Sequence, residues 1–336
     1  MRTGPPQGPP QDGDDSLNLP APRNLRPRAL SELLDVGLTL YRDNFLHFIG
    51  VAALVNLPLG LVTALLTTAV FNGTVFSAAD LLTEAGSVRP EAIAAAALGA
   101  VALALLAAAA SLFSTAALLY AVHARLAGLK AGVLDAYRNS LRRVPALLGA
   151  YVLLSLAFLG MFLPGAILIG VAAFLFGQGG GAVVGGVVLV LIGITLVFAG
   201  IGFSILFYIR WWFFKQAAVL ESHGPVSALG RSANLVRDRW WKTLGFAILL
   251  TLLTSALRLT PDAITSVPIA IFSGLEGQPS FLLTLINSAV STLTAILILP
   301  LSAIATTMLY FDHRVRGEAL DLEAGVADLE QQGARI

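Results

Sequence analysis

The side chains best suited to chemistry in this sequence are basic, and they fall in three groups along the chain. Each group borders a short segment in which apolar residues recur at helical spacing. The residues are Arg42, Arg138, Arg142, Arg143, Arg231, Arg237, Arg239 and Lys242. Cations beside an apolar helix face suit contact with anionic lipid headgroups, and each contributes about 1 kcal/mol near a charged leaflet. The alternative is that these charges only set the orientation of the chain in the membrane.

Acidic and histidine side chains show no catalytic pattern. Asp321 and Glu323 are close in sequence, but a solvated face explains them more simply than a metal site does. His313 follows Asp312, and a single histidine at a membrane edge is more typical of an interfacial anchor than of a ligand. Signatures of phosphate-binding loops, zinc proteases and serine hydrolases are not found. We therefore expect no enzyme activity, no cofactor and no metal.

Composition places the residues in a membrane protein. The chain has 336 residues, of which 57% are hydrophobic and 12% charged, whereas soluble domains have about 25% charged residues. Apolar runs long enough to cross a bilayer recur along it. The net charge of +1 gives no reason to expect nucleic-acid binding. The absence of cysteine excludes disulfides and thiol catalysis.

These runs predict an all-α polytopic protein with six transmembrane helices. The spans are expected within residues 45–71, 92–122, 144–177, 182–209, 243–258 and 281–311, and residues 261–278 are expected to form an outer loop. In the fourth span Gly186, Gly193 and Gly200 share one face, so a neighbouring helix can approach closely there. No ionisable residue falls in the middle of a span, which disfavours an ion-coupled carrier.

Three interfacial amphipathic helices are expected before the first, third and fifth spans. Arg42-Asp43 and Arg237-Asp238 recur at the same place in two of these units. The pattern predicts a threefold parallel repeat of a surface helix followed by a transmembrane hairpin. The predicted divisions are a disordered proline-rich tail at 1–27, repeats at 28–128, 129–224 and 225–317, and an acidic tail at 318–336.

Charge also predicts the orientation of the chain. All 21 lysine and arginine residues except Arg89 and Arg258 lie in the segments on one side of the predicted spans. Because positively charged loops stay in the cytoplasm, we expect both termini on the cytoplasmic side of the plasma (inner) membrane. The aromatic residues expected to anchor that interface are Trp211, Trp212, Trp240, Trp241 and Tyr310.

Three segments together resemble a known family. They are ALSELLD at 29–35 with YRDNF at 41–45, ALGRS at 228–232 with WWKTLG at 240–245, and LYFDHRVR at 309–316. This combination resembles bacterial integral-membrane proteins labelled as the membrane domain of glycerophosphoryl diester phosphodiesterase. Some members of that family join the membrane region to a soluble phosphodiesterase barrel. This chain has one His-Arg pair, His313-Arg314, but no Glu-x-Asp metal pair, so the resemblance implies the membrane region alone.

The sequence leaves three functions open. The first is a non-enzymatic accessory or scaffold that contacts lipid headgroups, and a membrane or cytoplasmic protein partner, at its cytoplasmic face. The second is a permease or channel component for a small or lipidic solute, because Pro58, Pro164 and Pro300 lie inside spans and can break helices around a cavity. The third is a membrane-bound phosphodiesterase.

Overall fold

The structure is a computed structural model, and it describes residues 30–71, 90–180, 182–276 and 281–318. Those ranges contain helices and short links, with no strand. The predicted disordered tail at 1–27 lies outside the described residues, and so does the acidic tail beyond Glu318.

Ten α-helices and one 3₁₀ turn are found in the described part of the chain. They are α1 (Leu30–Asp43), α2 (Phe45–Phe71), α3 (Pro90–Leu126), α4 (Val133–Ser140), η2 (Leu141–Arg143), α5 (Val144–Gln178), α6 (Ala182–Arg210), α7 (Phe214–Leu220), α8 (Pro225–Arg237), α9 (Trp240–Glu276) and α10 (Phe281–Glu318). Six of them, α2, α3, α5, α6, α9 and α10, are long and apolar enough to cross a bilayer. The prediction of an all-α protein with six such helices is confirmed.

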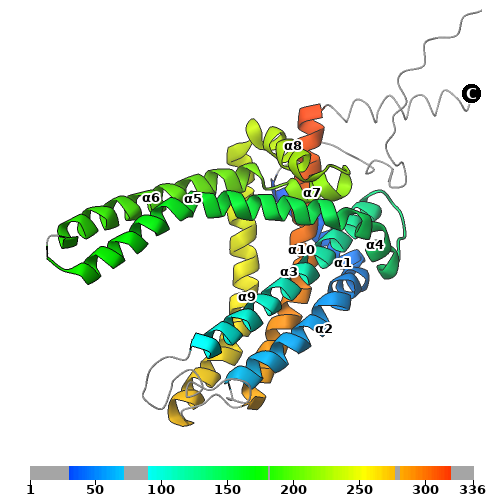
Figure 1. Cartoon of the computed structure of the whole chain (residues 1–336). Coiled ribbons are helices and arrows are strands. Elements are labelled where there is room, and N and C mark those ends of the chain that lie inside the picture. The colour runs from blue at the N-terminus through cyan, green and yellow to red at the C-terminus, as the bar shows by residue number, and fades with distance from the viewer. Residues whose placement is uncertain (1–29, 72–89, 181, 277–280, 319–336) are drawn as a thin grey trace, which may run out of the picture.

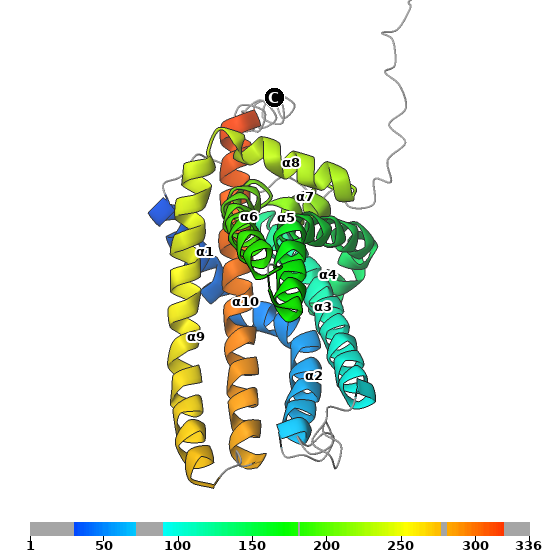
Figure 2. The same ribbon diagram turned by 60° about the vertical axis from the view of Figure 1, so that its left-hand side comes forward.

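The long helices form two groups (Figures 1 and 2). Helices α2, α3, α9 and α10 pack together as a bundle, with α10 against each of the other three. Helices α5 and α6 pair mainly with each other and project crosswise from the bundle. The hairpin therefore presents most of its apolar surface outward, as lipid-facing helices do.

Close contact between α5 and α6 depends on glycine, as the sequence predicts. A side-chain carbon at Gly193 would lie 3.0 Å from the carbonyl oxygen of Gly165, and one at Gly200 would lie 2.9 Å from that of Met161. Both distances are too short for a side chain, so only glycine lets the two backbones meet. The link between the helices turns at Gly179 and Gly180, whose φ angles of 70° and 55° are also accessible to glycine.

The outer loop predicted at 261–278 is wrong, because α9 continues as a helix to Glu276. Polar contacts with α10 stabilise this part of α9. The Thr265 hydroxyl lies 2.6 Å from the side-chain oxygen of Asn287, and Ser291 donates to the Asp262 carboxylate at 3.1 Å. Asn287 and Ser291 of α10 therefore form hydrogen bonds to a neighbouring long helix.

The three short helices that precede hairpins pack their apolar sides on the long ones. Leu33 of α1, Ala136 of α4 and Val236 of α8 are buried. Hydrogen bonds fix two of these helices further: the Tyr41 hydroxyl donates to the Leu297 carbonyl at 2.9 Å, and the Tyr137 hydroxyl donates to the Val51 carbonyl at 2.7 Å. These bonds join the end of α1 to the middle of α10 and join α4 to the first part of α2.

Two of the short helices end where the sequence predicts a corner. Helix α1 ends at Asp43 and α2 begins at Phe45; likewise α8 ends at Arg237 and α9 begins at Trp240. The threefold repeat and the interfacial position of these helices stay predictions. The short helix α7, between α6 and α8, is an element that the sequence analysis did not anticipate.

Candidate functional site

A tight turn between α7 and α8 places an acidic residue at the end of the bundle. Glu221 is the C-cap residue that follows α7, and Pro225 occupies the first turn of α8, where its missing N–H leaves no bond unmade. Between them Ser222 has a φ of 60°, a left-handed conformation that costs a serine about 1 kcal/mol. The turn directs the Glu221 side chain toward α8 and α10, and only 12% of that side chain is exposed.

Glu221 collects four partners. Arg231 of α8 binds it in a fork, Nε to Oε2 at 2.6 Å and Nη2 to Oε1 at 3.1 Å. From α10, Arg314 Nε lies 3.1 Å from Oε1, and the Tyr310 hydroxyl donates to the same oxygen. His223 Nε2 lies 3.1 Å from Oε2. One carboxylate thus joins the α7–α8 turn, α8 and α10.

These partners keep the carboxylate charged. Burial alone raises the pKa of Glu221. The hydrogen bonds from Arg231 and Tyr310, together with the charges of Arg314 and Arg231, more than offset burial, so the pKa of Glu221 lies below its ordinary value. A carboxyl group in this state holds neighbouring elements together and is poorly suited to act as a general acid near neutral pH.

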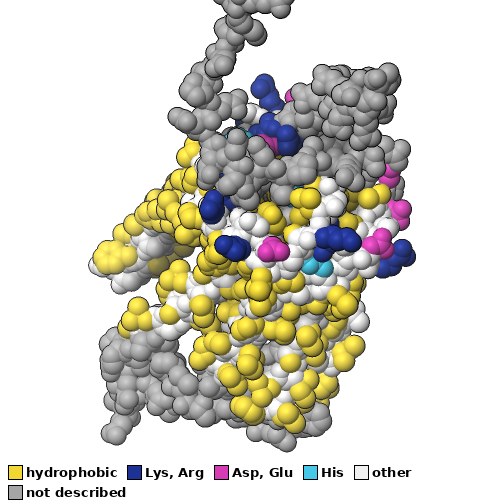
Figure 3. All heavy atoms as spheres, turned by 90° about the vertical axis from the view of Figure 1, so that its right-hand side faces the viewer, with side chains coloured by type: hydrophobic (Ala, Val, Ile, Leu, Met, Phe, Trp, Pro, Cys, Tyr) yellow, Lys and Arg dark blue, Asp and Glu magenta, His cyan; other side chains and the backbone are white. Residues whose placement is uncertain are grey.

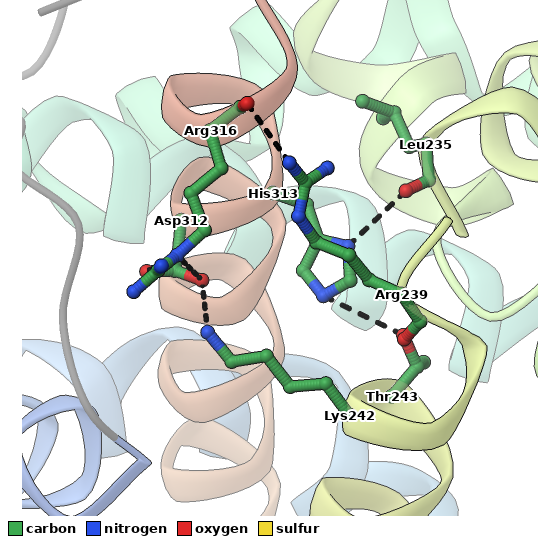
Figure 4. Close-up of polar contacts among 7 residues, drawn as sticks. All are labelled: Leu235, Arg239, Lys242, Thr243, Asp312, His313 and Arg316. Carbon is green, nitrogen blue, oxygen red and sulfur yellow. Dashed lines mark hydrogen bonds and ion pairs between the residues drawn. The ribbon is translucent and has the colours of Figure 1, made fainter. Parts of the chain in front are cut away.

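A second buried carboxylate, Asp312, lies on α10 two residues from both Tyr310 and Arg314. It accepts from Lys242 Nζ of α9 at 2.5 Å and from Arg316 Nε at 3.0 Å (Figure 4). Arg239, at the corner between α8 and α9, donates to the Arg316 carbonyl at 2.8 Å. The cluster therefore ties the start of α9 to the end of α10.

His313 is buried between the two clusters. Its Nδ1 lies 3.2 Å from the Leu235 carbonyl, and its Nε2 lies 3.5 Å from the Thr243 hydroxyl. The expectation that His313 is an interfacial anchor is wrong, since its side chain has no exposed surface. The same correction applies to Tyr310, whose ring is fully buried against Phe213 and whose hydroxyl meets Glu221.

We name these two clusters the inner-edge lock, which comprises Glu221, Arg231, Lys242, Tyr310, Asp312, Arg314 and Arg316. The expected headgroup contacts of Arg231 and Lys242 are corrected here, because carboxylates of the protein itself already bind both cations. Sequence reasoning missed Glu221 and Arg314. Glu221 and Arg314 are far apart in the chain, and a local sequence pattern cannot predict a contact between such residues.

Other predicted contact residues face outward, and we name them the exposed basic face. Arg42, Arg138, Arg142 and Arg237 are exposed, and the side chain of Arg42 is 80% exposed. On the side of the molecule drawn in Figure 3, charged side chains form a band, and the surface on one side of the band is mainly hydrophobic. Such a boundary is expected at the level of lipid headgroups.

Arg143 and the tryptophans occupy mixed positions. Arg143 is half-buried, and its Nε has no partner among the described residues. Trp241 is 78% exposed, as an interfacial anchor should be, whereas Trp211, Trp212 and Trp240 are half-buried.

Two cavities lie among the long helices. A groove of about 470 Å³ is lined by α5, α6 and α9, and a pocket of about 250 Å³ is lined by α3, α7, α9 and α10. Pro58, Pro164 and Pro300 lie inside helices and line neither cavity, so these cavities do not arise at helix breaks as the sequence suggested. Among the described residues, no group of three His, Asp or Glu side chains could hold a metal ion.

Comparison with known families places the chain in one of them. A family model described as a domain of unknown function (DUF7847) matches residues 45–313. The chain belongs to the DUF7847 family. The match runs from the start of α2 to His313, so it includes five of the long helices, most of α10 and both buried carboxylates.

No curated protein and no solved structure matches the chain. The DUF7847 description carries no activity, and nothing links it to the membrane domain of glycerophosphoryl diester phosphodiesterase. That resemblance stays a prediction.

Proposed function

We propose that this DUF7847 protein is a non-enzymatic membrane scaffold that docks its cytoplasmic face on anionic lipid headgroups and on a protein partner. The observation that carries the proposal is the exposure of Arg42, Arg138, Arg142 and Arg237. In the inner-edge lock, by contrast, each lysine and arginine is paired with a carboxylate of the protein itself. In this proposal the plasma membrane holds the protein with both termini in the cytoplasm.

Physical chemistry supports a role for these arginines in lipid contact. A guanidinium group binds phosphate through paired N–H donors and remains charged at any physiological pH. Arg42 lies 3.5 Å from Asp43, but both side chains are more than half exposed, so water screens this pair and Arg42 stays available to a phosphate. The lock beneath fixes α8 and so keeps Arg237 at the surface.

Lipid selectivity tests the proposal directly. The protein is reconstituted in phosphatidylcholine vesicles, and spin-labelled phosphatidylglycerol is compared with spin-labelled phosphatidylcholine. We expect the wild type to prefer phosphatidylglycerol and the variant R42Q/R138Q/R237Q to lose that preference, by about fivefold for each arginine in direct contact. Arg258→Gln is the matched control, since Arg258 is exposed on α9 but does not belong to the exposed basic face. An unchanged preference in the folded triple variant would refute headgroup docking.

The two cavities favour a second candidate, a permease or channel component for a small or lipidic solute. Such a function needs space between spans, and the groove and the pocket provide it. Sealed vesicles loaded with a fluorescent phospholipid analogue or a small polyol test for passage. If the loaded compounds leave these vesicles no faster than they leave protein-free vesicles, transport is excluded and docking is the function that stands.

A further inference from the structure

The groove and the pocket share two lining residues, Trp212 and Thr251. We call the first the apolar groove; its walls include Phe158 of α5, Ile205 of α6 and Ile248 of α9. We call the second the polar pocket. Because Trp212 and Thr251 line both, the two cavities are adjacent, with an apolar groove beside a smaller and more polar pocket.

The junction holds an unused hydrogen-bond donor. Trp212 Nε1 is buried and has no partner among the described residues. An indole nitrogen can only donate, and burying such a donor without an acceptor is unfavourable. Its position at the meeting point of the two cavities indicates that an occupant presents an acceptor oxygen there.

Gln216 adds a second unused polar group. Its side chain is 2% exposed, its Oε1 has no partner in the described part of the chain, and it lines the polar pocket. The nearby hydroxyls of Thr254, Ser302 and Thr306 donate to carbonyls of their own helices. These hydroxyls therefore satisfy carbonyls rather than Gln216, whose amide remains able to both donate and accept.

One charged residue is among those that line the polar pocket. Lys215 lines the polar pocket, and its Nζ lies 5.6 Å from the centre of the Tyr151 ring. It makes no ion pair with any described residue, and no aspartate or glutamate lines either cavity. This differs from the inner-edge lock, where every lysine and arginine has a carboxylate. A half-buried cation without a carboxylate favours an anion.

We propose that the joined cavities bind one anionic amphiphile. Its chain lies in the apolar groove between the α5–α6 hairpin and α9, and its headgroup lies in the polar pocket. There an acidic oxygen accepts from Trp212 Nε1 and balances the charge of Lys215. A fatty-acid carboxylate and a phospholipid phosphate share this chemistry. The site requires neither headgroup docking by the exposed basic face nor transport.

Photolabelling in membranes tests this site. The full chain, in phosphatidylcholine vesicles, is labelled with diazirine-bearing palmitic acid and, separately, with diazirine-bearing phosphatidylglycerol. We expect label on residues 201–212 and 244–252, which line the groove. Lys215→Gln should lower this labelling by about tenfold, the loss typical of a charge-assisted contact. Ile248→Trp, which fills the groove, should lower it similarly without altering the charge.

Matched variants separate the site from general effects on the protein. Lys130 is exposed and lines neither cavity, so Lys130→Gln, the control for Lys215→Gln, should leave labelling unchanged. Ile264 is also exposed and lines neither cavity, so Ile264→Trp, the control for Ile248→Trp, should leave labelling unchanged. R42Q/R138Q/R237Q should also leave it unchanged, which distinguishes this site from surface docking. If K215Q and I248W lower labelling by only one of the two probes, that lipid class is the ligand. If they lower labelling by both probes, the site accepts either class. Label spread evenly over the lipid-facing helices, or unaltered in folded K215Q and I248W, overturns the proposal.

Discussion

Arg231 and Arg237 lie on the same short helix, α8, and face different surroundings. Arg231 is half-buried and forks onto Glu221, whereas Arg237 is exposed at the end of the helix. Arg231 belongs to the inner-edge lock, and Arg237 belongs to the exposed basic face. The difference teaches that the role of a basic group at a membrane edge depends on whether a distant element supplies a carboxylate. With a carboxylate the group stabilises the fold, and without one it stays available for binding.

Removing the carboxylate at the centre of the lock should have the largest effect. Glu221→Ala removes the carboxylate that Arg231 and Arg314 bind and that accepts from Tyr310, so we expect a loss of about 3 kcal/mol in the free energy of unfolding. Thermal melting in a mild detergent measures it. Asp238→Ala is the control, because Asp238 is exposed at the end of α8. A melting temperature as high as that of the control would contradict the lock.

Breaking the second cluster should cost less. Asp312→Asn keeps the shape of the side chain but removes the charge that Lys242 and Arg316 share, and we expect a loss of about 2 kcal/mol. The effect is smaller because the asparagine oxygen can still accept from Lys242 and Arg316, whereas Glu221→Ala removes the whole side chain. Denaturant melts of both variants in parallel rank the two clusters. A greater loss in D312N than in E221A would reverse the ranking.

Acid should weaken the lock. The pKa of Glu221 in the folded protein lies below the ordinary glutamate value of 4.5, so its stabilising effect is fully present above pH 4.5 and is lost as the pH falls through the lowered pKa. We expect the melting temperature to fall more steeply below pH 4.5 in the wild type than in Glu221→Gln, which cannot titrate at this position. Parallel slopes for the two proteins would show that Glu221 does not carry this dependence.

The sequence predicts the six long helices well because their signal is local. A bilayer requires a long apolar run, and such runs are visible without any knowledge of packing. The glycine contacts of α6 are likewise visible, because spacing alone puts Gly193 and Gly200 on one face. The end of α9 is not predicted, since its helix depends on partners such as Asn287 that belong to α10.

The candidate sites are predicted only in part for the same reason. Composition and periodicity identify basic residues at one edge, but they do not separate Arg231 from Arg237. The separation needs Glu221 and the fold that brings α10 beside it. Trp212 shows the same limit: its type predicts an interfacial anchor, whereas its indole nitrogen lies buried at the junction of two cavities.

Changing the exposed member of the α8 pair should have the smallest effect on stability. Arg237→Gln removes no contact between described residues, so we expect a change within about 0.5 kcal/mol. Arg231→Gln leaves Glu221 with a weakened set of partners and should lower the melting temperature clearly. Equal melting temperatures for R231Q and R237Q would remove the distinction between the lock and the exposed basic face.

The most direct test of headgroup docking is the shift in melting temperature when phosphatidylglycerol is added to the protein in phosphatidylcholine nanodiscs. A lipid that binds the folded state stabilises it. We predict an upward shift for the wild type. For R42Q/R138Q/R237Q we predict the wild-type melting temperature in phosphatidylcholine alone and no shift on adding phosphatidylglycerol. A full shift in the triple variant would contradict the assignment of the exposed basic face to anionic lipid.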